Sequence, residues 1–95
     1  MNAEQKKKCA KIAQYYGEGS QLFILQEECA ELIQAVSKIR RGAPNAYDHF
    51  IEEIADVSIM IEQLTSYMDD DDKTTLYKKV NEKINRQLER ISEVG

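Results

Sequence analysis

The chain has 95 residues, and its 17 acidic side chains outnumber its 13 lysines and arginines, giving a formal net charge of -4 at pH 7. This length is enough for one domain, residues 1–95, and too short for two separate cores. The negative charge argues against a nucleic-acid partner, which needs a basic face, and no apolar run approaches the roughly 20 residues of a membrane span.

Two helices are predicted in the first half of the chain. Apolar residues recur at helical spacing through residues 3–16, and Gly17 ends that segment. Ser20 is the expected N-cap of a second helix, which continues to Arg41 and stops at Gly42. Basic side chains in the last turn of this helix suit the negative end of its dipole.

The second half of the chain predicts two further helices. The third starts near Asn45 or Tyr47 and continues to about Met68. The acidic run over residues 69–72 then interrupts the helical pattern and supplies the N-cap of a fourth helix, over about residues 73–92. Because no segment alternates apolar and polar residues in the manner of a strand, the predicted fold is all-α with four helices.

Size and cysteine content set expectations for assembly and location. A chain of this length buries only about 60% of its unfolded surface and is marginally stable alone, so we expect an oligomer, most simply a dimer. Cys9 and Cys29 are too few for a disulfide scaffold, and no charged and then apolar leader opens the chain. We therefore expect a cytoplasmic protein without a membrane partner.

One carboxylate lies in an unexpected place on the second predicted helix. At about 100° per residue, Glu28 falls among the apolar side chains and not opposite them. Glu31 falls on the edge of the same apolar sector, and Glu27 lies outside it. A carboxylate on an apolar face is costly to bury unless it is protonated, paired or bound to a cation.

The third predicted helix repeats this arrangement. Glu53 falls within the apolar sector, Asp56 lies on its edge, and Glu52 points away. If the second and third helices pack side by side, the two pairs of acids converge, and protons or a cation must neutralise them. These acids offer only oxygen atoms as ligands, and no His or Cys joins them. This donor set favours Mg²⁺ over zinc.

A plainer interpretation is that these acids lie at the boundary of an apolar face and reach solvent or pair with basic side chains. A chain in which 32% of the residues are charged places some acids there by chance. The repeated i, i+3 spacing on two helices favours the cation site instead. His49, four residues before Glu53, could contact that carboxylate from outside the ligand set, although a histidine that is exposed or at the edge of the apolar face is the simpler expectation.

The acidic residues form the pattern EExxE at 27–31 and ExxD at 53–56, and the stretch Asn-Glu-Lys-Ile-Asn-Arg follows at 81–86. Together they resemble the signature of the MazG-like nucleoside triphosphate pyrophosphohydrolases, which are all-α proteins that form dimers or tetramers. The resemblance covers about residues 20–91. It implies Mg²⁺-dependent hydrolysis of a (deoxy)nucleoside triphosphate to the monophosphate and pyrophosphate, with Mn²⁺ as a substitute ion and nucleotide-pool housecleaning as the role.

The resemblance also implies roles for single residues. It assigns metal binding to the four acids that the helical wheels select, Glu28, Glu31, Glu53 and Asp56. The candidates for handling the attacking water are Glu27, Glu28 and Glu31. The candidates for binding the substrate are Asn81, Lys83 and Arg86. For Lys83 and Arg86, a solvated face of the fourth helix is an equally good interpretation.

Two departures from the family pattern concern contacts to the phosphates and the base. Ile84 stands where an aromatic residue is common, and Gln87 stands where a second arginine is common. Related enzymes that act on phosphoribosyl-ATP, dUTP or dCTP share the acidic pattern, so the pattern does not distinguish among these substrates. A catalytically silent helical oligomer that scaffolds a partner is the alternative from a different class, and it requires no Mg²⁺.

Overall fold

Four α-helices make up most of the chain in the computed structural model, which describes residues 1–94. The helices are α1 (Ala3–Tyr16), α2 (Glu18–Arg40), α3 (Ala46–Thr65) and α4 (Asp70–Val94). No strand occurs within the described range, so the prediction of an all-α fold with four helices is confirmed. Residue 95, the last of the expected domain, lies outside the described residues.

α1 begins at a capping box. The Asn2 side chain accepts a hydrogen bond from the Gln5 backbone N–H at 2.8 Å, and the Gln5 side chain accepts one from the Asn2 N–H at 2.9 Å. Gly17 follows the helix with φ 86°, a positive angle that glycine adopts without the steric cost of a side chain. The predicted end of this helix at Gly17 is confirmed.

α2 starts earlier than the sequence predicts. Gly17 also serves as its N-cap residue, and the Gly17 carbonyl accepts a hydrogen bond from the Gln21 N–H at 3.1 Å. The helix therefore begins at Glu18, and the prediction of Ser20 as its N-cap is wrong. Because the positive φ at Gly17 turns the chain within one residue, the second helix needs no longer linker.

A tight connection joins α2 to α3. α2 ends at Arg40, one residue before its predicted end, and Gly42 follows with φ 72°. The Gly42 N–H donates to the Ile39 carbonyl at 3.0 Å, which satisfies one of the free carbonyls at the helix end. Asn45 takes a left-handed conformation, and Ala46 starts α3. Such a short connection makes the two helices antiparallel neighbours.

The boundary between α3 and α4 lies about one turn before its predicted place. α3 ends at Thr65 and does not continue to Met68, and α4 begins at Asp70. The Asp69 side chain accepts a hydrogen bond from the Asp72 N–H at 2.8 Å. The acidic run therefore does supply the N-cap, as predicted, but its first residue is the cap and the others form the first turn.

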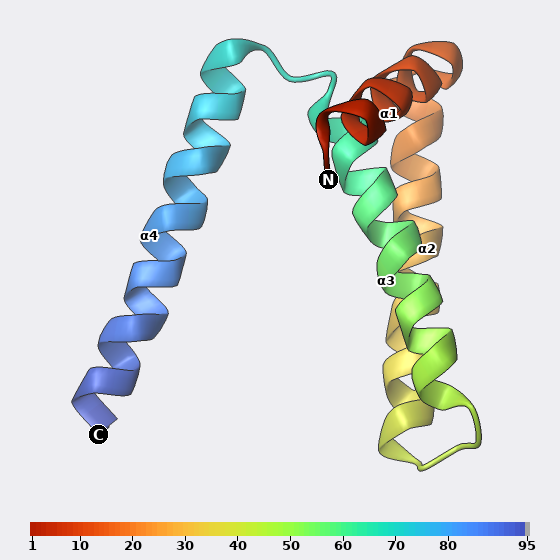
Figure 1. The fold of residues 1–95 in the computed structure, drawn as a ribbon, viewed down its shortest axis with the longest axis vertical. Coiled ribbons are helices and arrows are strands. Elements are labelled where there is room, and N and C mark those ends of the chain that lie inside the picture. The colour runs from red at the N-terminus through yellow and green to blue at the C-terminus, as the bar shows by residue number, and fades with distance from the viewer. Residues whose placement is uncertain (95) are drawn as a thin grey trace.

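α1, α2 and α3 form one packed unit. Figure 1 shows α2 and α3 side by side in opposite directions, with α1 across the end where α2 starts and α3 finishes. The buried apolar side chains are few and mostly small, namely Cys9, Ala13, Ala35, Ala46 and Met60. The Tyr67 hydroxyl, just beyond α3, donates to the Ala13 carbonyl at 2.5 Å and ties α1 to the end of α3.

α4 stands apart from this three-helix unit. It extends away from the end of α3 (Figure 1) and, over its described residues, has no extended packing against α1, α2 or α3. One face of α4 carries exposed apolar side chains at helical spacing, namely Leu76, Val80, Ile84, Leu88 and Ile91. We call these five residues the α4 stripe. Nothing else within the described chain covers it.

The described chain has little interior and much apolar surface. None of its large side chains is fully buried, and Phe23 on α2 is 71% exposed. Within residues 1–94, no helix combines the length and the apolar character that a membrane crossing requires. Uncovered apolar surface of this extent marks sites of interaction with other molecules.

Candidate metal centre

Three carboxylates converge between α2 and α3. Glu28 belongs to α2, and Glu53 and Asp56 lie one turn apart on α3. One oxygen from each carboxylate can be chosen so that all three lie within 4.8 Å of one another. The antiparallel packing of α2 and α3 brings the acids together, and each helix contributes the acid that its apolar face carries. The structure therefore unites three of the four acids that the helical wheels select.

The cluster has a buried side and an exposed side. Glu53 is only 6% exposed, Glu28 is half-buried, and Asp56 is exposed. The Oε2 atoms of Glu28 and Glu53 are both buried and have no hydrogen-bond partner. Because unpaired carboxylate oxygens are costly to bury, these two atoms require a proton or a cation. The all-oxygen donors and the solvent-facing Asp56 fit Mg²⁺ or Mn²⁺, which retain water or phosphate ligands.

Glu31 and Glu27 lie outside the group of three. Both are exposed on α2. Glu31 lies close enough to Glu28 to share a proton with it when Glu28 is protonated, but it does not join the set of closely spaced ligand atoms. Glu31 therefore borders the cluster next to Glu28, and the expectation that it joins the ligand set stays a prediction. The metal and catalytic roles assigned to Glu31 and Glu27 by resemblance stay predictions.

Burial and neighbouring charges raise the pKa of Glu28 from 4.5 to about 7. Desolvation is the largest cause, followed by the negative charge of Glu31 and Asp56, the hydrogen bond with Glu31, and the charge of Glu53. Glu28 therefore binds a proton near neutral pH when no cation is present. A cation that binds here competes with that proton, so its affinity increases with pH.

The raised pKa of Glu28 predicts that the metal-free protein is more stable in mild acid. Protonation of Glu28 favours the folded state, and this contribution is full below about pH 4.5 and is lost as the pH rises through about 7. We expect the melting temperature in EDTA to fall between about pH 5 and about pH 8, and excess Mg²⁺ to reverse the fall at the higher pH. Scanning calorimetry on the wild type and on Glu28→Gln checks this, and an equal fall in the variant would contradict it.

His49 supports Glu53 from the preceding turn of α3. Its Nε2 lies 3.3 Å from Oε1 of Glu53, and the histidine is half-buried. One oxygen of Glu53 is thus in contact with His49, while the other, Oε2, has no hydrogen-bond partner and remains for a ligand. The i, i+4 spacing of the two residues indicates such a contact, and the half-buried His49 agrees with the expected edge position.

The predicted substrate-binding residues lie on the helix that stands apart. Asn81, Lys83 and Arg86 are exposed on α4, which does not pack against α2 or α3 in the described chain. The structure of one chain therefore does not bring them to the carboxylates. Sequence spacing alone cannot reveal this, because the direction in which a terminal helix leaves the fold depends on the turn over residues 66–69 and on what covers the helix.

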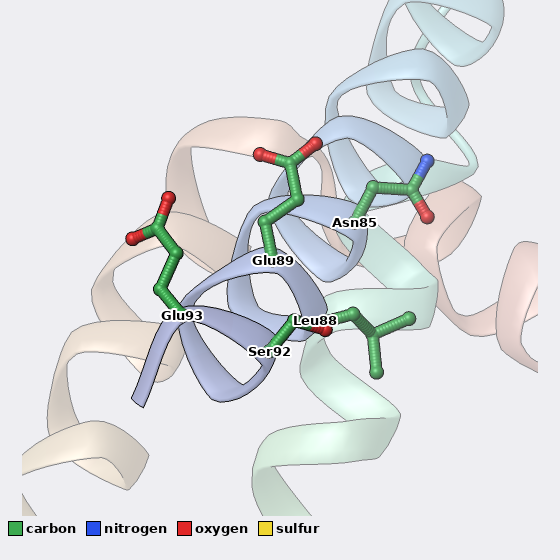
Figure 2. A pocket seen from close by; sticks show the side chains of 5 residues that line it. All are labelled: Asn85, Leu88, Glu89, Ser92 and Glu93. Atoms are coloured by element: carbon green, nitrogen blue, oxygen red, sulfur yellow. The ribbon is translucent and has the colours of Figure 1, made fainter. Parts of the chain in front are cut away.

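An open hollow lies near the end of α4, far along the chain from the acids. Figure 2 shows that its lining side chains all come from this one helix; they are Asn85, Leu88, Glu89, Ser92 and Glu93. Because no second element closes the hollow, it is a groove between side chains of a single helix. It adds nothing to the carboxylate site.

Comparison with known proteins gives no relative from which a role could be transferred. No protein-family model, no curated protein and no solved structure matches this chain. The functional argument therefore rests on the residues, their spacing and their geometry.

Proposed function

We propose that this protein is a Mg²⁺-dependent nucleoside triphosphate pyrophosphohydrolase, which converts a (deoxy)nucleoside triphosphate to the monophosphate and pyrophosphate. The observation that carries the proposal is the cluster of Glu28, Glu53 and Asp56, in which two buried oxygens lack a partner. The motifs that resemble those of the MazG-like enzymes include the same three acids. A cytoplasmic location and a role in clearing the nucleotide pool belong to this proposal.

The residues in and around the cluster would have different roles in the reaction. Glu28, Glu53 and Asp56 would hold the ion, which supplies positive charge to the phosphate oxygens when bound. Glu31 is exposed, borders the cluster and lies outside the ligand set, so its carboxylate is the better placed acceptor for the proton of the attacking water. His49, 3.3 Å from Oε1 of Glu53, would help to orient that carboxylate. Glu27, which is also exposed, is the second candidate for orienting that water.

The same proposal includes a homo-oligomer, a dimer or a tetramer, in which α4 of one copy packs against α2 and α3 of another. The α4 stripe is uncovered, and α2 and α3 expose apolar side chains near the cluster, namely Ile24, one turn before Glu28, and Ile59, one turn after Asp56. Burying these surfaces against each other would stabilise the association through the hydrophobic effect. A second copy would thereby supply the fourth helix that the three-helix unit lacks.

Charge favours the same docking. Beside the α4 stripe runs a row of basic residues at helical spacing, namely Lys79, Lys83, Arg86 and Arg90. α2 and α3 expose acids at the cluster, namely Glu31 and Asp56, and α2 also exposes Glu27. Opposite charges would orient the two copies. Lys83 and Arg86 would then contact the triphosphate, which arginine binds through two parallel hydrogen bonds. Asn81, on the other flank of the stripe, is the weaker candidate for a substrate contact.

A panel of ribonucleoside and deoxyribonucleoside triphosphates, assayed with and without Mg²⁺, tests the proposed activity. We expect release of pyrophosphate and a monophosphate from at least one nucleotide, loss of activity in EDTA and recovery with Mn²⁺. Phosphoribosyl-ATP, dUTP and dCTP belong in the panel because enzymes with the same acidic pattern use them. If no nucleotide is hydrolysed with Mg²⁺ in excess, the proposal is wrong and a silent helical oligomer is favoured.

A further inference from the structure

A hollow between α1, α2 and α3 lies about two helical turns from the carboxylate cluster and has a volume of about 390 Å³. Its lining includes Ile12, Tyr16, Gln21, Ile24, Met60 and Gln63. We infer that this hollow receives the nucleobase of the substrate and that Gln21 and Gln63 read the hydrogen-bonding edge of the base. The inference rests on the proposed nucleotide hydrolysis and adds to it the part of the protein that selects the base.

Two buried glutamines are among the residues that line this largely apolar hollow. Gln21 is 4% exposed and Gln63 is 3% exposed, although glutamine is usually a surface residue. The Oε1 atom of Gln21 is buried without a hydrogen-bond partner. A buried amide oxygen without a partner is costly, and a ligand N–H would satisfy it once a rotation of the Gln21 side chain turns the oxygen toward the hollow. A mostly apolar pocket with a few convergent polar groups is typical of small-molecule sites, and its volume falls within their range.

The remaining lining residues suit a flat ring. Ile12, Ile24 and Met60 supply apolar contacts, and Tyr16 lines the hollow while remaining 58% exposed. An exposed tyrosine at the mouth of an apolar pocket can stack on a planar heterocycle. A purely aliphatic occupant would leave the Gln21 amide unpaired, whereas a nucleobase presents both a flat face and N–H donors on its edge. The amide of glutamine matches such an edge with one donor and one acceptor.

The position of the hollow relative to the acids fits one bound nucleotide. On α2, Gln21 precedes Glu28 by seven residues, and on α3, Gln63 follows Asp56 by seven residues. Both separations are two helical turns, or about 10 Å, along antiparallel helices that run side by side. The hollow and the cluster therefore occupy the same pair of helix faces, at a separation that the sugar and the first phosphate of a nucleotide can bridge.

The amides are tested by Gln21→Leu and Gln63→Leu, which keep the size of the side chain and remove its polar atoms. Activity is measured on the nucleotide panel and on inorganic tripolyphosphate, which carries no base. We expect kcat/KM for the preferred nucleotide to fall by about tenfold or more in each variant, because an unmade hydrogen bond to a base costs that much. The preference among bases should weaken, while tripolyphosphate hydrolysis stays unchanged. Gln26→Leu, an exposed position on the same helix, is the matched control.

The outcomes separate this inference from the proposed activity. If the variants lose nucleotide and tripolyphosphate hydrolysis by the same factor, or keep the wild-type base preference, the hollow does not read the base. If the wild type hydrolyses nothing, the activity proposal fails, and the hollow is tested directly by titrating adenosine, guanosine, cytidine and uridine against the Met60 methyl NMR signal. A shift that disappears in Gln21→Leu supports the base site. No shift with any nucleoside, or an altered oligomeric state in the variant instead, overturns it.

Discussion

Replacing Glu53 by glutamine is expected to reduce Mg²⁺-dependent pyrophosphate release by roughly 100-fold or more, since the ion loses its most buried charged ligand. Glutamine has nearly the same shape, so the packing between α2 and α3 and the contact with His49 can persist. Removing a buried charge should leave the melting temperature in EDTA unchanged or higher at about pH 8, because one of the mutually repelling carboxylates is gone. The measurements are steady-state kinetics over a range of Mg²⁺ concentrations and thermal unfolding of the same preparation.

Glu52→Gln is the matched control for this variant. Glu52 is the neighbouring residue, carries the same side chain and is exposed, so its substitution makes the same change in net charge outside the cluster. We expect its activity and its Mg²⁺ dependence to resemble those of the wild type. Equal losses in both variants would show that activity follows net charge and not the cluster, and full activity in Glu53→Gln would remove the basis of the proposed function.

The second large effect is expected from mixing two inactive proteins. If α4 serves the site of a neighbouring copy, Arg86→Ala and Glu53→Gln impair different halves of each composite site. In a dimer that exchanges its subunits at random, half of the molecules are mixed, and each mixed molecule has one site with an intact cluster and an intact α4. Activity should therefore recover to about a quarter of the wild-type value. The assay is pyrophosphate release after the two variants have been unfolded together and refolded.

Two controls show whether recovered activity comes from mixed oligomers. Each variant refolded alone should stay inactive, and size-exclusion chromatography with light scattering should show that both keep the oligomeric state of the wild type. A mixture that stays as inactive as its parents, although mixed oligomers have formed, would contradict an α4 that acts in another copy. A monomeric wild type would contradict it as well.

The four helices and the pairing of acids could be predicted from the sequence because both depend on local periodicity. Glu28 and Glu53 interrupt apolar faces, and antiparallel packing of those faces brings them together in the register that the short connection between α2 and α3 sets. The error at Ser20 has a local cause too, since Gly17 ends one helix and caps the next. A pattern of residue types does not show that a single glycine suffices for that turn.

Features that depend on long-range packing could not be predicted in this way. The separation of α4 from the cluster reflects the path of the chain after α3, and no periodicity within the helix encodes that path. The burial of Gln21 and Gln63 depends on α1 lying across α2 and α3, which closes the hollow around two residues that look like surface positions. Glu31 lies on the edge of an apolar face, where a small rotation of the helix decides between the cluster and solvent.

The most direct measurement is calorimetric titration of Mn²⁺ and Mg²⁺ into the metal-free protein at about pH 8, where Glu28 is ionised. We expect saturable binding in the wild type and in Glu52→Gln, and binding at least about tenfold weaker in Glu53→Gln. Binding of equal strength in all three proteins, or no binding in the wild type even with a nucleotide present, would contradict a cation site between α2 and α3.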